Sequence, residues 1–246
     1  MELLYKLRVL KNIVRRKTGL DPVHGVSLHH DLRRLVPELR VNVLFDVGAN
    51  CGQSAVEYSR CFPRARIYCF EPVRSTFLEL CDRTSGMSHV QCHNVALGST
   101  RGSARMVVDE KSELSFVVEG DPVSVNDVRL EDVRMETLDH FCDEEKLEHI
   151  DLLKIDTEGQ DLEVLRGGAR LIDEMRISVL QVEAGVSRSN NRHVAFEAFR
   201  EYLEPRRYAL FGLYEQVHEW VDMKPHLRRV NAVFISSRII DAARTA

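Results

Sequence analysis

Two glycines, an asparagine and an aspartate form the first group of residues that could do chemistry. They interrupt the stretch VLFDVGANCGQSAVEY, residues 43 to 58, which begins as a buried strand and ends as a helix. The turn between them holds Asp46, Gly48, Asn50 and Gly52. Glycine permits positive φ and lets backbone approach a ligand closely. The pattern therefore predicts a ligand-binding loop at the end of a strand.

The order of these residues indicates the kind of ligand. A dinucleotide-binding loop has the pattern G-x-G-x-x-G, whose glycines press a helix start against a pyrophosphate. This loop reads G-A-N-C-G instead, and it begins with an aspartate that would repel a pyrophosphate. A ligand with a cationic or zwitterionic part and no phosphate suits it better. S-adenosylmethionine, with its ammonium, carboxylate and sulfonium, meets these demands.

Glu71 is the next candidate, because it ends the following apolar run in the sequence FEP. A carboxylate at that point can accept hydrogen bonds from both hydroxyls of a ribose. The alternative is a solvated carboxylate at a strand end. Asn94, Ala96 and Leu97 end the third apolar run, where they would face the adenine through backbone and apolar contacts.

A second group of titratable residues follows later in the chain. Asp156 ends LLKID, Glu158 comes two residues on, Glu183 ends SVLQVE, and His193 follows soon after. Carboxylates at one sheet edge repel each other, which raises their pKa values toward proton acceptance. Each is a candidate catalytic base, and Asp156 is also a candidate cofactor contact. The alternatives are a helix cap for Asp156, a place in the first turn of that helix for Glu158, and a solvated helix start for His193.

The same carboxylates raise the question of a metal ion. Hard oxygen ligands could bind a divalent cation that orients a sugar diol. The sequence contains no D-x-D motif and no run of histidines that supports this. No metal site is therefore predicted.

The elements that must position these residues alternate along the chain. Strands are predicted at 41–47, 65–71, 89–97, 150–156, 177–183, 208–215 and 230–236, and helices at 54–62, 73–83, 161–175 and 194–203. Ser54 and Glu57 are spaced as a capping box. Residues 99 to 137 hold short β-like pieces and are interpreted as an insertion or peripheral strands. Such alternation predicts a parallel sheet covered on both faces, with ligands at the carboxyl ends of its strands.

Four motifs taken together resemble a known family. FDVGANCGQSA, CFEP, METLDHF and LLKIDTEGQDLEVLRGG are similar to the FkbM-type methyltransferases, from about Val43 to the terminal VNAVFIS. The resemblance implies an α/β, Rossmann-like class I methyltransferase fold with a mostly parallel seven-stranded sheet. Members often read KIDVEGAE where this chain has KIDTEGQD, so Gln160 and Asp161 alter the mouth of the site.

The resemblance also implies an activity. Members are mostly O-methyltransferases that act on sugars or on hydroxyls of polyketides, glycolipids and surface polysaccharides. The expected function is methyl transfer from S-adenosylmethionine to a hydroxyl, on a sugar of a glycolipid or polysaccharide. The alternatives are a polyketide or other small secondary metabolite as acceptor, a nicotinamide-dependent oxidoreductase, and a non-catalytic ligand-binding module.

Composition limits the partners and the compartment. The 246 residues carry a formal charge of −4, which gives no electrostatic case for nucleic acid. The six cysteines form no C-x-x-C and are expected to be reduced thiols. No apolar run approaches the roughly 18 residues of a membrane-spanning helix, and no signal peptide is evident. These features predict a cytoplasmic protein.

The N-terminal segment has a pattern of its own. Leu3, Leu7, Leu10 and Val14 recur at helical spacing among basic residues. Such a helix can lie on the inner membrane face, or it can cap the core of its own domain with a solvated basic face. The expected organisation is an N-terminal helix and connector over residues 1–40 and a methyltransferase domain over residues 41–246.

Overall fold

The computed structural model describes residues 24–108, 116–118, 129–219 and 225–245. The predicted amphipathic helix near the N-terminus lies outside these residues. Among the described helices, none combines the length and apolar character needed to cross a membrane. All six cysteines are free thiols.

A seven-stranded sheet forms the centre of the described fold. Its order is β3-β2-β1-β8-β9-β11-β10. Strands β3, β2, β1, β8 and β9 are parallel, and β11 runs antiparallel to both of its neighbours. The bounds are β1 Val43–Val47, β2 Arg66–Phe70, β3 Val90–His93, β8 Ile150–Ile155, β9 Ile177–Gly185, β10 Tyr208–His218 and β11 Leu227–Ser236. The predicted sheet of seven strands is confirmed.

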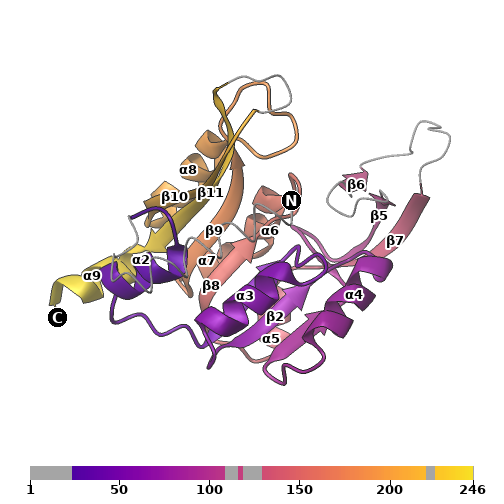
Figure 1. Cartoon of the computed structure of the whole chain (residues 1–246), viewed down its shortest axis with the longest axis horizontal. Coiled ribbons are helices and arrows are strands. Elements are labelled where there is room, and N and C mark those ends of the chain that lie inside the picture. Colours follow the sequence, from indigo (N-terminus) through magenta and orange to yellow (C-terminus); the bar gives the residue numbers. More distant parts are fainter. Residues whose placement is uncertain (1–23, 109–115, 119–128, 220–224, 246) are drawn as a thin grey trace, which may run out of the picture.

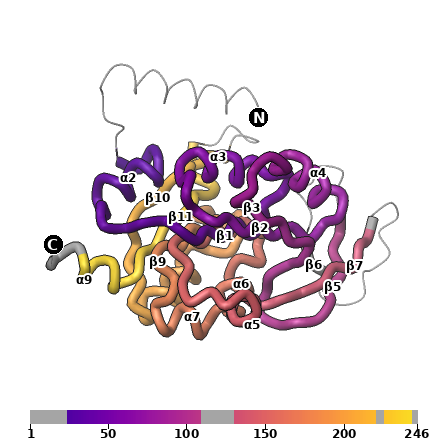
Figure 2. Tube along the Cα trace, turned by 90° about the horizontal axis from the view of Figure 1, so that it is seen from below, coloured from indigo at the N-terminus to yellow at the C-terminus, as the bar shows by residue number. Residues whose placement is uncertain are grey.

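Helices cover both faces of this sheet, as Figure 2 shows. All residues of β1 and β9 are buried, as expected for strands covered on both faces. One apolar cluster joins the sheet to α5–α8, and a second joins it to α2–α4 and α9. The bounds are α2 Leu28–Leu35, α3 Gln53–Cys61, α4 Arg74–Thr84, α5 Leu138–Glu144, α6 Asp161–Gly167, α7 Ala169–Asp173, α8 Phe196–Leu203 and α9 Ser237–Thr245.

A second, four-stranded sheet lies at the side of the molecule opposite β10 and β11 (Figure 1). Its order is β4-β7-β5-β6, with bounds β4 Ala96–Leu97, β5 Gly102–Val108, β6 Phe116–Val118 and β7 Arg129–Glu136. The peripheral strands expected in this region are therefore present. The predicted third strand, however, divides: residues 90–93 join the main sheet and residues 96–97 join the second one.

Two helix predictions need correction. The capping box of Ser54 and Glu57 is wrong, because α3 begins at Gln53 and Gly52 occupies the N-cap with a left-handed φ of 85°. The helix expected over 161–175 breaks at Gly168 into α6 and α7. A Cβ on Gly167 would lie 2.0 Å from the carbonyl oxygen of Gly98, so the chain passes too closely there for any larger residue. Helices α2, α5 and α9 were not predicted.

Helix α2 is tied to the sheet by a buried carboxylate. Asp31 is 1% exposed, and its Oδ2 accepts hydrogen bonds from the Tyr214 hydroxyl at 2.9 Å and from the Gly25 N–H at 2.7 Å. Leu32 and Val36 pack beside it in the same apolar cluster as α3 and α4. The described part of the predicted connector thus packs on the main sheet.

This anchor gives a stability prediction. Tyr214→Phe leaves a buried carboxylate with one donor fewer, so we expect the free energy of unfolding to fall by about 1.5–3 kcal/mol. Tyr208→Phe is the matched control, because the Tyr208 hydroxyl donates to the neutral carbonyl of Ile177 at 2.9 Å. Its expected loss is about 0.5–1.5 kcal/mol. Denaturant unfolding measures both, and an equal or smaller loss for Tyr214→Phe would contradict the anchor.

Candidate active site

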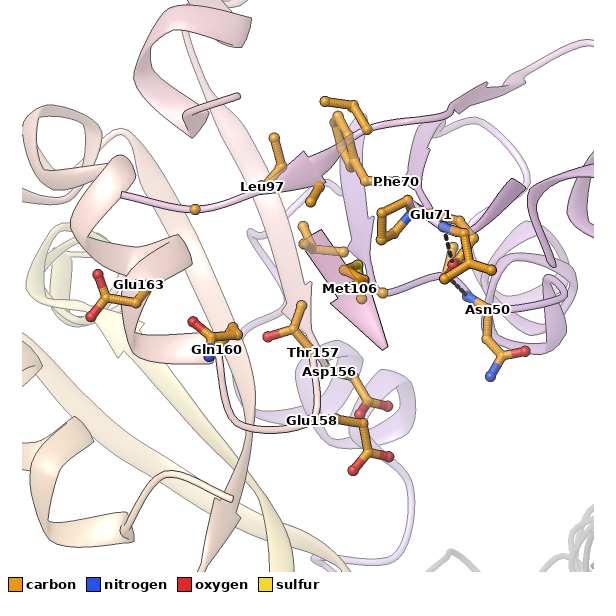
Figure 3. A pocket seen from close by; sticks show the side chains of 18 of the residues that line it. Asn50, Phe70, Glu71, Leu97, Met106, Asp156, Thr157, Glu158, Gln160 and Glu163 are labelled. Atoms are coloured by element: carbon orange, nitrogen blue, oxygen red, sulfur yellow. Dashed lines mark hydrogen bonds between the residues drawn. The ribbon is translucent and has the colours of Figure 1, made fainter. Parts of the chain in front are cut away.

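A cavity of about 720 Å³ opens at the carboxyl ends of β1, β2, β8 and β9. The loops after β1 and β8 line one part of it, and the second sheet, which includes β4, lines another. Figure 3 shows Glu71 and Asn50 at one side and Gln160 and Glu163 at the other, with Asp156 and Glu158 between them. The position agrees with the rule that open α/β sheets bind ligands at this edge.

Backbone contacts fix the loop after β1. Gly48 has a φ of 76°, and a Cβ there would lie 2.0 Å from the carbonyl oxygen of Asp156. The N–H groups of Gly48 and Ala49 both donate to the Phe70 carbonyl at 3.0 Å. Only glycine allows the loops after β1 and β8 to approach so closely. The glycine that the sequence pattern emphasised therefore serves the contact between two loops.

Asp46 lies behind this loop and is fully buried. Lys154 Nζ lies 3.0 Å from Asp46 Oδ1 and 3.3 Å from Asp156 Oδ2. Burial lowers the pKa of Lys154, but the two carboxylates outweigh this and raise the pKa well above its ordinary range. The charged Lys154 side chain therefore lies between Asp46 in the core of the sheet and Asp156 at its edge.

Glu71 braces the cavity from the end of β2. Its Oε2 accepts from the Asn50 N–H and its Oε1 accepts from the Val73 N–H, each at 3.0 Å. Burial raises the pKa of Glu71 to about 7, although these two N–H donors oppose the shift. Asn94 Nδ2 donates to the carbonyls of Glu71 and Pro72 at 2.9 and 2.8 Å, which holds the turn that follows.

Three of the predicted catalytic residues meet beside the turn after β8, where Glu158 and Glu183 line the cavity and His193 lies beneath them. His193 Nε2 lies 2.8 Å from Glu183 Oε2 and 3.8 Å from Glu158 Oε2. Arg229 pairs with Glu183, and Arg192 Nε lies 3.7 Å from Glu158 Oε2. Burial, followed by the charges of the neighbouring carboxylates, raises the pKa of Glu158 to about 7.

The segment after β8 is a turn and provides no helix cap. Glu158 has a φ of 51°, which is uncommon for a residue with a side chain and is typical of functional sites. Asp161 is buried and accepts from the Thr157 N–H and hydroxyl at 3.2 and 2.8 Å. It also accepts from the Glu183 N–H at 3.3 Å. Asp161 therefore lies beneath the mouth of the cavity, which it was expected to alter, whereas Gln160 does line it.

The structure divides the predicted site residues into two sets. Those that line the cavity are Gly48, Asn50, Glu71, Ala96, Asp156, Glu158 and Glu183. Those outside the lining are Asp46, Gly52, Asn94 and His193. Asp46 and Asn94 hold the loops from behind, Gly52 starts α3, and His193 lies beneath two lining carboxylates.

Sequence reasoning missed a polar wall from the two C-terminal strands. Glu215, Arg229 and Asn231 line the cavity, and Asn231 Nδ2 donates to Glu215 Oε2 at 3.2 Å. An irregular register between Tyr214 and Val217 accompanies the φ of 46° at Glu215. The available signal was the alternation of Arg229 and Asn231, which places two polar side chains on one face of the strand.

Comparison with known proteins identifies the family. A family model for the methyltransferase FkbM domain matches residues 46–210, which are 165 of the 246 residues. The chain belongs to this family. The match and the sheet order confirm the predicted class I methyltransferase fold, and this FkbM methyltransferase is S-adenosylmethionine-dependent.

Named relatives agree with this result. The 2-O-methyltransferase NoeI of Sinorhizobium fredii is 25% identical over 63% of this chain and 68% of its own. The methyltransferase sdnD of Sordaria araneosa is 33% identical over 50% of this chain and 59% of its own. The chain thus spans less than two thirds of sdnD. Among solved structures, TrmK of M. capricolum in complex with S-adenosylhomocysteine has a TM-score of 0.47 at 10% identity, covering 87% of this chain and 70% of that one.

The Glu71 carboxyl gives a pH prediction. Only the ionised form can accept from both ribose hydroxyls, so binding favours that form and affinity rises with pH. With a pKa of about 7, roughly a tenth of the groups are ionised at about pH 6 and nine tenths at about pH 8. We expect calorimetry to show S-adenosylhomocysteine binding about tenfold more weakly at the lower pH.

Two variants identify the group that titrates. Glu71→Gln should bind weakly at both pH values and lose the dependence. Glu158→Gln should keep it, although the pKa of Glu158 is also about 7. A pH dependence that survives in Glu71→Gln would contradict the role of Glu71.

Proposed function

We propose that this methyltransferase transfers the methyl group of S-adenosylmethionine to a hydroxyl of a saccharide. One observation carries the proposal: a single cavity extends from the buried Glu71 carboxylate to a polar wall, with carboxylates after β8 and polar side chains on β9, β10 and β11. The cofactor supplies a methyl group on a sulfonium, which is a good leaving group. The chain must bind the cofactor, align the acceptor and take its proton.

The cofactor belongs at the Glu71 end of the cavity. Each Glu71 oxygen uses one lone pair for a backbone N–H and keeps capacity for a ribose hydroxyl. Phe70, Ala96 and Leu97 offer apolar surface for the adenine beside it. The turn from Gly48 to Asn50 then faces the amino-acid part of the cofactor. These residues fit the group by both charge and polarity.

The acceptor belongs against the opposite wall. Asp156, Glu158, Glu215 and Asn231 present carboxylate and amide oxygens to the cavity. Hydroxyl groups donate to such oxygens, so a polyhydroxylated ring suits this wall better than an apolar acceptor. The relative named 2-O-methyltransferase also supports transfer to oxygen. A sugar of a glycolipid or polysaccharide is accordingly the proposed acceptor.

Asp156 is the proposed proton acceptor. Its side chain lines the cavity directly after β8, and Lys154 holds Oδ2 from behind at 3.3 Å. This pairing fixes the carboxylate in one orientation, and the second oxygen is left to receive a hydrogen bond from the acceptor hydroxyl. Asp156 would take the proton that the acceptor hydroxyl loses, and the bound cofactor would supply the methyl group and leave as the thioether S-adenosylhomocysteine.

Mass spectrometry tests the function. Glycolipid and polysaccharide extracts are incubated with the enzyme and isotopically labelled S-adenosylmethionine, and we expect one labelled methyl group on a sugar hydroxyl. A heat-inactivated sample is the control. Label found only on nitrogen, or only on molecules without sugars, would contradict the proposal.

A substitution tests the proton acceptor. Asp156→Asn removes the basic oxygen and keeps the shape, so we expect turnover to fall by about 10²–10⁴-fold. Affinity for S-adenosylhomocysteine should remain within about twofold, because Glu71 and the loop after β1 are untouched. Turnover that stays at the wild-type level would assign the proton to another group.

A further inference from the structure

We infer that Glu158, Glu183 and His193 form a binding site for a first-row divalent cation at the acceptor end of the cavity. The three ligand atoms come from the turn after β8, from β9 and from the loop before α8, so only the folded chain assembles them. A set of two carboxylates and one imidazole favours Mn²⁺, Co²⁺ or Zn²⁺, whereas Mg²⁺ prefers sites made of oxygen ligands alone.

The spacing of the three side chains suits one ion. Their ligand atoms all lie within 4.8 Å of one another, with His193 Nε2 at 2.8 Å from Glu183 Oε2 and 3.8 Å from Glu158 Oε2. An ion with bonds of about 2.1 Å holds neighbouring ligand atoms about 3 Å apart and opposite ones about 4 Å apart. The observed separations lie close to this range without any movement of the backbone.

The orientation of His193 is fixed by an amide behind it. Asn190 Oδ1 accepts from the N–H groups of Arg192 and His193 at 3.1 and 3.3 Å, and its Nδ2 donates to the Arg228 carbonyl at 3.1 Å. The amide therefore presents its oxygen to His193 Nδ1, 3.0 Å away, and Nδ1 must carry a hydrogen.

In a neutral imidazole, a hydrogen on Nδ1 makes Nε2 an acceptor or a metal ligand. A neutral imidazole protonated on Nδ1 turns its Nε2 lone pair toward the carboxylates of Glu183 and Glu158. Such a lone pair and a carboxylate repel each other at 2.8 Å unless a proton or a metal ion joins them, and metal-binding histidines are commonly oriented in this way by an oxygen on the opposite nitrogen. The competing state is an imidazolium ion paired with Glu183, which the experiment below distinguishes.

Charge and access are also compatible with a cation. Arg229 pairs with Glu183 through Oε1, which leaves Oε2 facing His193. Arg192 lies 3.7 Å from Glu158 and is 42% exposed, so its charge is screened by water. Glu158 and Glu183 line the cavity while His193 lies beneath them. An ion held there has one open side, toward the acceptor.

A second group with similar spacing does not qualify. Glu136, His140 and Glu144 also lie within metal-binding distance of one another. Glu136, however, already pairs with Arg101 at 3.0 Å and Arg134 at 3.4 Å. These two guanidinium groups already compensate the charge of the buried Glu136 carboxylate, so we assign this group to a structural ion network.

The role of the ion rests on the proposed function. The open side faces the wall assigned to the saccharide, where adjacent hydroxyls of a sugar ring can bind a divalent cation together. This would orient the acceptor before methyl transfer. An ion in this position would restrict the acceptors to molecules that carry two neighbouring hydroxyls.

Titration of the full chain with Mn²⁺ tests the site without cofactor or acceptor. Calorimetry and the electron paramagnetic resonance signal of free Mn²⁺ should both report one site of micromolar affinity. His193→Gln and Glu183→Gln should weaken it by at least about a hundredfold, and Asn190→Ala by about 10–100-fold. Glu163→Gln is the matched control, because Glu163 lines the same cavity, is not one of the three proposed ligands and pairs with Arg166. It should bind Mn²⁺ as the wild type does.

Affinity for S-adenosylhomocysteine shows that each variant is folded. The inference is overturned if the wild type binds no Mn²⁺ below millimolar concentration, which would assign His193 to an imidazolium pair. It is also overturned if Glu163→Gln weakens binding as much as His193→Gln. Mn²⁺ binding without sugar methylation would retain the metal site and reject the proposed function. Sugar methylation by protein that binds no Mn²⁺ would retain the proposed function and reject the metal site.

Discussion

The site depends on the ion pairs that the buried ammonium of Lys154 makes with two carboxylates. Asp46 and Lys154 are register partners on the adjacent strands β1 and β8, and Asp156 receives the same ammonium at the sheet edge. Removing one partner of a buried ion pair costs about 3–5 kcal/mol, because the other charge is left uncompensated. The cation thus fixes where β8 ends and where the turn carrying Asp156 and Glu158 begins.

Close backbone contacts continue from that point into the loops. Gly48 approaches the Asp156 carbonyl, and a Cβ on Gly159 would lie 2.4 Å from the Arg192 carbonyl. These contacts place the loops after β1, β8 and β9 in fixed relation. Glu71 completes the frame, since the same carboxylate that faces the cavity also accepts from the Asn50 N–H. The carboxylate proposed to bind the cofactor therefore also holds the loop after β1.

The two ends of the cavity differ in their electrostatics. At one end a single buried carboxylate is held by backbone donors. At the other, several carboxylates gather around few cations, and burial raises the pKa of both Glu71 and Glu158 to about 7. Buried acidic groups with raised pKa values cost stability, and such costs are common at sites that bind a ligand.

Glycine spacing and apolar runs are local properties, so the residue pattern alone predicts the sheet and places the loop after β1, Glu71 and the carboxylates after β8 and β9 at one edge of it. Asp46 and Asn94, which were expected to contact the ligand, lie outside the cavity lining, because a polar residue beside a turn has the same local pattern whether it faces a cavity or supports a loop. The folded chain is needed to show that His193 meets Glu158 and Glu183. It is also needed to show that Glu215, Arg229 and Asn231 line the same cavity as Glu71. These residues are far apart in the chain, and their distances follow from strand register and loop packing, which no local pattern encodes.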